Sequence, residues 1–325
     1  MRQRCLILIN FIILLIIVVA CSNKGGGISL ILGVKVEKAI ESYLKNTVNS
    51  IKYTMNEKGI ICDKLEKITD RIIQIRVVKE DYISETKNFL KEYLSFEIVN
   101  PVEDDKTVFL LILKPFNAEK IKVTAFDQVF TILRNRLIKS GISTPQIRKQ
   151  DSNKITIILP ELKTIRRIID LISKTGNLEF KLMDNEANLN EISWDNIPPD
   201  DEILYGKSKA YLLKKQALMN GDVITEAKVL LSNDFKESFV VLKFDQRGAT
   251  IFEEITANNI GRRLAIIFDK EVYSAPTIRE KISGGYAMIS RNLTSEEAHD
   301  LAIILGSSAY PVPVFILEQG KYSKP

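Results

Sequence analysis

The chain has 325 residues, of which 45% are hydrophobic and 27% charged, a length and composition typical of a globular protein with room for two compact domains. Its formal net charge of +5 comes from basic residues spread among acidic ones, which does not favour nucleic-acid binding. One histidine and three cysteines are too few for a zinc site of the usual kind, and no spacing of residues predicts a catalytic centre, a metal site or a cofactor site.

Residues 1–21 predict a signal peptide or a membrane anchor. Arg2 and Arg4 precede an apolar run over residues 5–20, whose length falls between that of a secretory signal and that of a spanning helix. The run ends on Val18-Val19-Ala20-Cys21, which is similar to a bacterial lipobox, in which the cysteine is acylated. We therefore expect the N-terminus to contact membrane lipid, with Cys21 as the candidate lipid attachment site. An uncleaved anchor with an incidental cysteine is the alternative.

Two helices of the next segment end at a glycine. Apolar residues at helical spacing run from Val36 to Met55, before Gly59, and others run from Phe126 to Leu137, before Gly141. Each glycine is expected to end its helix, and Gly141 is expected to take the left-handed conformation of a helix C-cap. A strand, a helix and a strand follow each glycine, at residues 73–77, 79–93 and 94–99 in one case and at 155–159, 162–174 and 178–183 in the other.

These elements predict two copies of one supersecondary unit. Gly59 and Gly141 are 82 residues apart, as are Ile73 and Ile155. The pattern is that of the split βαβ, or ferredoxin-like, unit, whose helices cover one face of an antiparallel sheet. We therefore expect an α+β fold with a duplicated ferredoxin-like base at residues 22–183, in two repeats of about 28–115 and 116–183.

A second, inserted α+β domain, the head, is expected at residues 184–289. Residues 184–204 contain no lysine or arginine and predict an exposed loop or linker, in which Trp194 docks. Thr294 and Glu297 predict the start of a last helix, and this helix and a final strand are expected to return to the base over residues 290–318, before a tail at 319–325. Strands are expected in the head at 209–216, 225–232, 237–245, 263–269 and 271–276, with a helix at about 248–259.

Several blocks of the sequence resemble, in order, the periplasmic region of the SecD family of Sec-translocon accessory subunits. They are residues 131–163, 175–184, 217–231, 259–285 and 293–319. The resemblance implies a non-enzymatic protein of the cytoplasmic (inner) membrane whose bulk faces the periplasm. It also implies that the head binds unfolded preprotein emerging from the SecYEG channel, with SecF, SecYEG and YajC as partners and no cofactor or metal.

The sequence departs from the family at three points. Only Gly26 and Gly27 match a family Asp-Leu-Lys-Gly-Gly motif, and Glu161 stands in place of a usual glycine after Leu159-Pro160. The family continues beyond the equivalent of Pro325 into membrane helices that relay protons, so proton-coupled work is not expected of this chain alone. The alternative functions are a truncated SecD-like lipoprotein, which binds peptides or acts as a scaffold uncoupled from the translocon, and a degenerate gene fragment.

The candidate functional residues form three groups, and each has a structural alternative. The apolar residues of the candidate binding surface could instead fill the core of the head. The glycine pair that is a candidate hinge between head and base could instead form a hairpin turn. Arg134 and Arg136 could be solvated charges on the surface of a helix. His299 is expected to be an exposed or half-buried helix residue. The groups are the family motif residues Gly26, Gly27, Arg134, Asn135, Arg136 and Gly141, the polypeptide-binding head surface Ile267, Phe268, Val272 and Tyr273, and the hinge Gly284 and Gly285.

Overall fold

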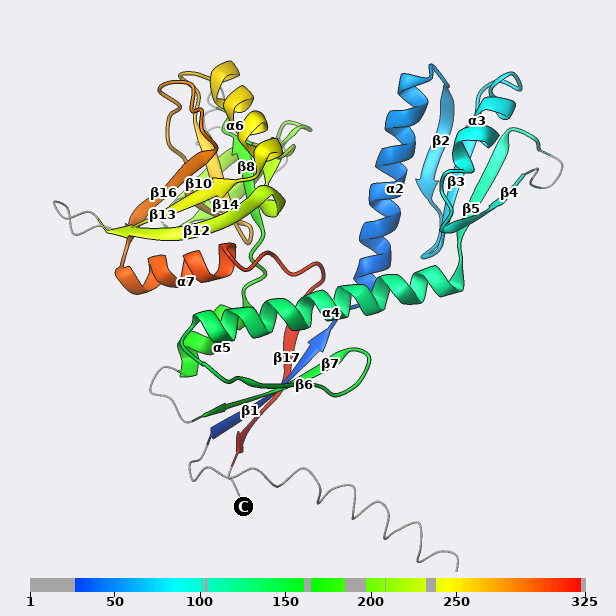
Figure 1. The fold of residues 1–325 in the computed structure, drawn as a ribbon. Coiled ribbons are helices and arrows are strands. Elements are labelled where there is room, and N and C mark those ends of the chain that lie inside the picture. Colours follow the sequence, from blue (N-terminus) through cyan, green and yellow to red (C-terminus); the bar gives the residue numbers. More distant parts are fainter. Residues whose placement is uncertain are drawn as a thin grey trace, which may run out of the picture.

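The computed structural model describes residues 27–100, 102, 105–160, 165–184, 197–207, 209–231 and 238–322. The predictions for Cys21, Gly26 and Trp194 lie outside these residues. The described chain is a mixed α+β protein, as predicted, and its elements form three units, which we call the central, side and upper units (Figure 1).

The central unit is one antiparallel sheet covered on one face by two helices. The sheet has the strand order β17-β1-β7-β6, and apolar residues of β1 and β7 share a core with α4 and α5. In chain order the unit reads strand, helix, strand, strand, helix, strand. Its elements are β1 (Gly27–Val34), α4 (Pro115–Lys139), β6 (Gln146–Lys149), β7 (Lys154–Pro160), α5 (Ile165–Ser173) and β17 (Val314–Tyr322).

The side unit is inserted between β1 and α4 and has a hydrophobic core of its own. Its antiparallel sheet has the order β2-β3-β5-β4. The unit begins with a helix and ends with two consecutive strands, so its chain order differs from that of the central unit. Its elements are α2 (Glu37–Glu57), β2 (Cys62–Lys67), β3 (Ile72–Val77), α3 (Tyr82–Leu90), β4 (Phe96–Val99) and β5 (Val108–Leu113).

The upper unit is inserted between α5 and β17. It contains a six-stranded sheet, β10-β9-β15-β14-β8-β11, and a three-stranded sheet, β12-β13-β16. Its elements are β8 (Leu178–Leu182), β9 (Asp201–Gly206), β10 (Ala210–Lys214), β11 (Met219–Asn220), the 3-10 helix η2 (Gly221–Val223), β12 (Ile224–Leu231), β13 (Ser238–Phe244), α6 (Gln246–Asn258), β14 (Leu264–Phe268), β15 (Glu271–Ser274), β16 (Tyr286–Leu293) and α7 (Ser295–Leu305).

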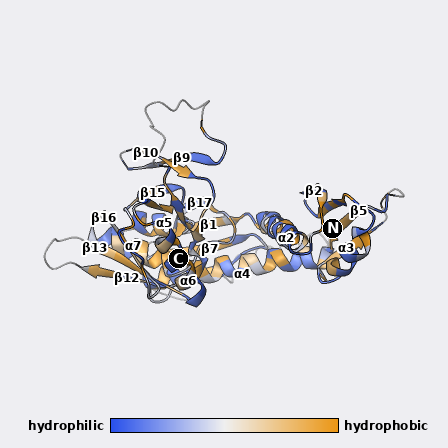
Figure 2. Cartoon of the chain, turned by 90° about the horizontal axis from the view of Figure 1, so that it is seen from above, coloured by the Kyte–Doolittle hydropathy of each residue, from blue (hydrophilic) through white to orange (hydrophobic). Residues whose placement is uncertain are grey.

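The side and upper units stand over opposite ends of α4. Figure 1 shows α4 running beneath both units, and Figure 2, a view from above, shows α2 and α3 at one end of α4 and the upper unit at the other. The long helix α4 is therefore the element that spans the molecule from one unit to the other.

The predicted repeat boundaries differ from the structure at two strands. β1 pairs with β7 and β17, so it belongs to the sheet of the second predicted repeat rather than the first. Gly27 permits this pairing, because a Cβ there would lie 2.3 Å from the Leu159 carbonyl oxygen. β8, which was expected to close the second repeat, pairs with β14 in the upper unit, where the Phe180 ring contacts the rings of Phe244 and Phe252.

Two further predictions need correction. Residues 201–206, predicted to lie in an exposed loop, form β9, which pairs with β10 and β15. The helix expected to return to the base, α7, packs mainly on β12 and β13 of the upper unit, because its buried residues, such as Leu301 and Ile304, join the core beneath that sheet, and it also touches α4 of the central unit. Only the strand β17 returns, and it pairs with β1.

Candidate functional site

The three-stranded sheet of the upper unit has one buried face and one exposed apolar face. On β13 and β16, Val240, Leu242 and Ile289 are buried in the main core. The alternate residues point the other way, as the period of a strand requires. We call the apolar residues of this other side the open face, and they are Leu230, Phe239, Val241, Tyr286 and Met288.

The residues of the open face are neighbours across the strands. Leu230 pairs with Phe239, and Val241 pairs with Met288. The exposed fractions are 53% for Leu230, 49% for Tyr286 and 55% for Met288, while Phe239 and Val241 are half-buried. Sequence reasoning missed this face, because residues 286–289 are all apolar and only their burial in the structure alternates between the two sides of the strand.

The predicted polypeptide-binding surface is wrong for three of its four residues. Ile267, Phe268 and Val272 are only 1–2% exposed, because β14 and β15 lie inside the six-stranded sheet. Ile267 and Val272 belong to a small core with Leu213, whereas Phe268 belongs to the main core. Tyr273 is half-buried, with its ring 5.4 Å from that of Phe268. The core alternative considered from the sequence therefore holds for this segment.

The chain passes between the central and upper units twice, at residues 174–177 and 306–313. We call these two segments the junction. Arg136 of α4 reaches both segments. Its Nη2 donates hydrogen bonds to the carbonyl oxygens of Thr175 (3.0 Å) and Ser308 (3.1 Å), and its Nη1 donates to those of Leu171 (3.3 Å) and Lys174.

Arg136 is completely buried, which contradicts the expectation of a solvated helix charge. It lies beside Leu133 and Leu137 on the buried side of α4, whereas Arg134 and Asn135 are exposed. The carbonyl groups at the end of α5 supply the partners that a buried guanidinium requires, because the last carbonyls of a helix have no partner within it. Burial lowers the pKa of Arg136, and the nearby Tyr310 and Asp269 oppose that change.

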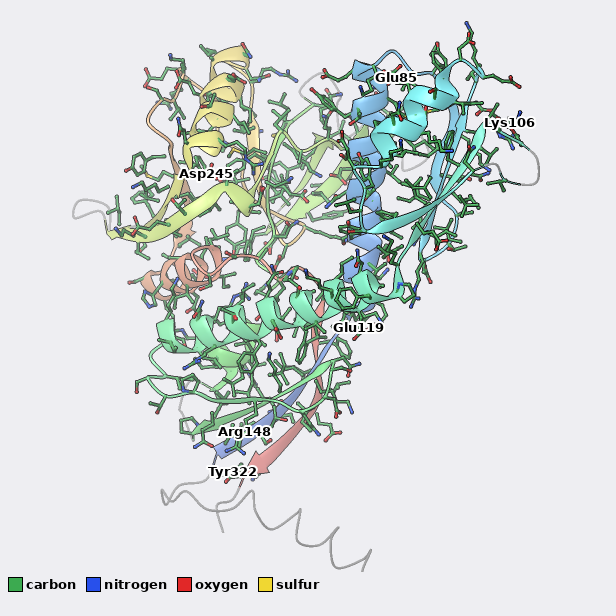
Figure 3. The ribbon with its side chains drawn as sticks, turned by 45° about the vertical axis from the view of Figure 1, so that its right-hand side comes forward. Glu85, Lys106, Glu119, Arg148, Asp245 and Tyr322 are labelled. Atoms are coloured by element: carbon green, nitrogen blue, oxygen red, sulfur yellow. The ribbon has the colours of Figure 1, made fainter. Side chains whose placement is uncertain are left out.

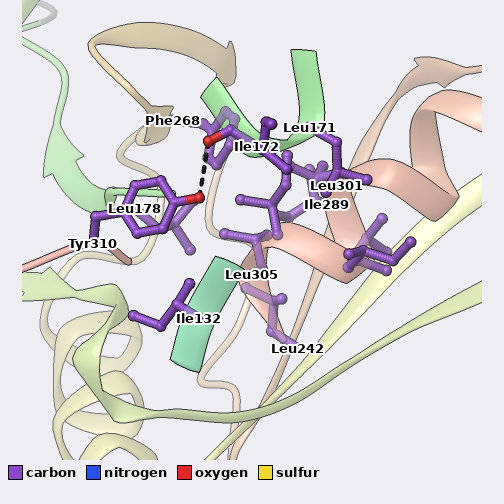
Figure 4. Close-up of a cluster of buried hydrophobic side chains, with 14 of the residues drawn as sticks. Ile132, Leu171, Ile172, Leu178, Leu242, Phe268, Ile289, Leu301, Leu305 and Tyr310 are labelled. Atoms are coloured by element: carbon purple, nitrogen blue, oxygen red, sulfur yellow. Dashed lines mark hydrogen bonds between the residues drawn. The ribbon is translucent and has the colours of Figure 1, made fainter. Parts of the chain in front are cut away.

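Tyr310 covers the Arg136 guanidinium from the return segment. Its ring centroid lies 4.2 Å from the guanidinium carbon, and its hydroxyl donates a 2.8 Å hydrogen bond to the Ile172 carbonyl oxygen (Figure 4). Burial raises the pKa of Tyr310 to about 12. The same view shows Ile132, Leu178 and Leu305 around the ring, so the junction lies within the main hydrophobic core.

Gly176 lets the outgoing segment pass close to Arg136. Its φ is +88°, and a Cβ at this position would lie 2.7 Å from Arg136 Nη2. The backbone N–H groups of Gly176 and Asn177 donate to the Asp269 carboxylate at 3.0 and 2.9 Å. The outgoing segment is therefore held both from α4 and from the end of β14.

An ion pair links α5 to α7 across the same boundary. Arg167 donates to Asp300 through Nε (3.0 Å) and Nη2 (2.7 Å), and its Nε lies 3.1 Å from Glu296. Hydrogen bonding to Asp300 raises the pKa of Arg167. His299, on the same helix, is exposed, as expected. The central and upper units are thus joined by apolar packing, by Arg136 and by a charged pair nearer the surface.

Of the predictions made for glycines, those for the helix ends are confirmed and the one for the hinge is wrong. Gly141 has a φ of +101° at the end of α4, as predicted, and Gly59 follows the end of α2, as predicted, with a φ of +66°. Gly284 and Gly285 also have positive φ, but they lie in the turn before β16, where the Gly285 carbonyl accepts a hydrogen bond from the Phe244 N–H. The predicted hinge position is therefore wrong, because the connections between the units are the two junction segments.

Two negative findings apply to the residues given above as described. They contain no group of three or more His, Cys, Asp or Glu side chains positioned to hold a metal ion. None of their helices is both long enough and apolar enough to cross a bilayer.

Comparison with known proteins identifies the family. Residues 126–185 match the model of the N-terminal P1 domain of protein translocase subunit SecDF, and residues 200–312 match that of the SecDF P1 head subdomain. The second range covers most of the upper unit.

Similar proteins are described as protein translocase subunit SecD. That of Calditerrivibrio nitroreducens is 39% identical over 312 residues, covering 90% of this chain and 59% of the relative. That of Magnetococcus marinus is 35% identical over 305 residues, covering 90% and 57%. A crystal structure of SecDF in its super-membrane-facing form is similar with a TM-score of 0.50 and 30% identity, covering 61% of this chain and 28% of that one. The chain thus spans just under three fifths of the curated relatives, and it belongs to the SecD family of protein translocase subunits.

Proposed function

We propose that this chain is an accessory subunit of the Sec protein-export machinery, which binds preprotein on the outer face of the cytoplasmic membrane and assists its translocation. The observation that carries the proposal is the similarity to SecD translocase subunits over 90% of the chain. In this proposal SecF, SecYEG and YajC are the partners, and residues 1–21 hold the chain to the membrane.

The open face supports polypeptide binding without catalysis. An unfolded client needs apolar surface for its side chains and free strand edges for its backbone, and neither requirement selects one sequence. In the described sheet, β12 and β16 are edge strands on either side of β13. Lys228, Lys243 and Glu226 interrupt the apolar residues, which suits reversible contact with many clients.

The junction supports a role for the central unit as the platform of the upper unit. Arg136 binds both crossing segments, and the main core continues from α4 and α5 into α7. We propose that these contacts set the position of the open face relative to the membrane-tethered end of the chain.

Photocrosslinking in cells tests the proposal. A photoreactive residue at Met288 (55% exposed) is expected to crosslink to a secretory protein stalled during export, whereas one at Ile68 (42% exposed), in a turn of the side unit, is expected to give no adduct. Equal adducts at both positions, or none at Met288, would contradict polypeptide binding at the open face. Adducts with peptides but with neither SecF nor SecY would favour the uncoupled peptide-binding alternative.

Gene deletion tests the export role separately. Loss of the chain is expected to slow secretion of reporter proteins, most clearly in the cold. Unchanged secretion at every temperature would count against the role in export, whatever the crosslinking result.

A further inference from the structure

A groove lies between α2 and α4, in a different part of the molecule from the open face. Its volume is about 470 Å³, and its lining includes Tyr43 and Asn46 of α2 and Asn117, Ile121 and Gln128 of α4. The groove lies where α2 rises from α4, near Glu119 in Figure 3. The function proposed above does not use it.

One unusually exposed apolar side chain lines the groove, and a second belongs to the residue that precedes Ser95 of the lining. Leu94 is 78% exposed and Phe116, which lines the groove, is 77% exposed, and these are the highest values among the large hydrophobic side chains in the described ranges. The two residues are held near each other, because Lys114 donates hydrogen bonds to the carbonyl oxygens of Ser95 (3.1 Å) and Leu94 (3.0 Å). Single exposed apolar residues are common, but two beside a groove indicate a contact surface.

The polar lining of the groove suits a polypeptide backbone. Asn46, Asn117 and Gln128 each offer an amide that both donates and accepts hydrogen bonds, as backbone groups require. Lys120 is the one charged residue among the described residues of the lining. A phosphate or an anionic lipid headgroup would call for a cluster of basic residues, so the charge of the groove favours an uncharged, hydrogen-bonding ligand.

We propose that this groove is a second polypeptide-binding site, which takes an extended segment with an aromatic or large aliphatic side chain. Phe116 and Leu94 contact the apolar side chain, Tyr43 and Ile121 form the apolar part of the groove wall, and the amides bind the backbone. Pro311 also lines the groove and belongs to the return segment of the junction, so a bound polypeptide touches the connection to the upper unit. The inference rests on the proposed function, because it supplies a further site for the same class of client.

Calorimetric titration of the full chain in lipid nanodiscs tests the inference, with empty nanodiscs as the blank. The probe is an unstructured peptide with a Phe-Leu pair at its centre, and the control probe carries Ser-Ser instead. Wild type is expected to bind two copies of the apolar probe. Ser42→Trp fills the groove and Met288→Asp charges the open face, and each is expected to remove one of the two sites.

Matched variants on one helix test the role of the groove residues. Phe116→Ser is expected to weaken the groove site about tenfold, since it removes a large apolar contact, whereas Val123→Ser, at a position 50% exposed and outside the lining, is expected to change the affinity less than about twofold. If wild type binds only one copy of the probe and Ser42→Trp still binds it, the inference is overturned and the proposed function remains intact. If wild type binds only one copy and Ser42→Trp abolishes this binding, the result supports the groove as a site and contradicts binding at the open face. Absence of binding by wild type would overturn both.

Discussion

Arg136 is a fully buried cation that donates four hydrogen bonds to backbone carbonyl oxygens. The planar guanidinium presents several donors in a fixed arrangement, so one side chain can bind carbonyls from α5, from the outgoing segment and from the return segment. Removal of the side chain leaves these carbonyls buried without partners, and each such group costs free energy. We infer that Arg136 fixes the junction more than any other single residue described.

Replacement of Arg136 by methionine is expected to lower the free energy of unfolding by about 3–5 kcal/mol, because the buried carbonyls lose their donors. Arg136→Lys is expected to cost less, about 1–3 kcal/mol, since an ammonium keeps some of the hydrogen bonds but cannot span both segments. Arg134→Met, on the exposed side of the same helix, is the matched control and is expected to change stability by less than about 0.5 kcal/mol. Urea unfolding measures all three. Equal stability of Arg136→Met and Arg134→Met would contradict the assigned role.

Tyr310 makes the stability of the junction depend on alkaline pH. Its pKa in the folded chain is about 12, whereas an unfolded tyrosine has a pKa of about 10. The folded state therefore favours the neutral hydroxyl. The resulting contribution to the free energy of unfolding is fully present below about pH 10 and is lost as the pH rises towards about 12. The loss by about pH 11 is expected to be about 1.4 kcal/mol.

Comparison with Tyr310→Phe isolates this contribution. Phenylalanine has no proton to lose, so the variant is expected to lose about 1.4 kcal/mol less than wild type between about pH 9 and pH 11. Urea unfolding followed by circular dichroism at both pH values measures the difference, and other ionisations cancel between the two proteins. The same pH dependence in both would show that Tyr310 titrates normally.

At the scale of elements, helices could be predicted well from the sequence. The ends of α2 and α4 follow from Gly59 and Gly141, and the start of α7 follows from Thr294, whose hydroxyl and backbone exchange hydrogen bonds with Glu297 in a capping box. These features are local, because the residues that fix each end lie within one turn of it.

Strand partners could not be predicted in the same way. β1 pairs with β17, which lies nearly at the other end of the chain, and β8 crosses from the predicted base into the upper unit. The sequence pattern sets which face of a strand is apolar but does not identify its neighbour. The continuous apolar run of β14 does not distinguish a core strand from a binding surface, because a strand buried on both faces lacks the alternation that marks an inside and an outside.

The candidate site was missed for a similar reason. Arg136 sits next to the apolar stripe of α4, and only the distant carbonyls of α5 and of the return segment make burial of its charge acceptable. The open face depends on the register of β13 and β16, which are separated by α6 and two further strands. The family resemblance indicated the right region, but the contacting residues follow from tertiary structure.

At the scale of the whole molecule, the parts that unfold together are set by how the buried hydrophobic residues divide into cores, and not by the number of units. The main core runs without interruption from the central unit into the upper unit, and it includes Leu133 of α4 and Leu301 of α7. The side unit instead has a separate core around Phe109 and Leu111, which also includes Ala118 from the first turn of α4. We therefore expect two cooperative units in folding, of which one is the side unit with the start of α4 and the other combines the rest of the central unit with the upper unit.

A pair of leucine-to-alanine variants tests this division. Leu111 and Leu133 are both completely buried, so each substitution is expected to cost about 2–5 kcal/mol through lost packing and the cavity left behind. Hydrogen exchange followed at increasing urea concentration is expected to show Leu111→Ala destabilising only the side unit and the start of α4, and Leu133→Ala destabilising the central and upper units together. Leu133 lies on α4, which belongs to the central unit and also provides Arg136 of the junction. A substitution at Leu133 is expected to weaken the upper unit because the two units share one core. If Leu133→Ala left the upper unit as protected as in wild type, the two would be independent, and Arg136 could not hold the open face in a fixed position.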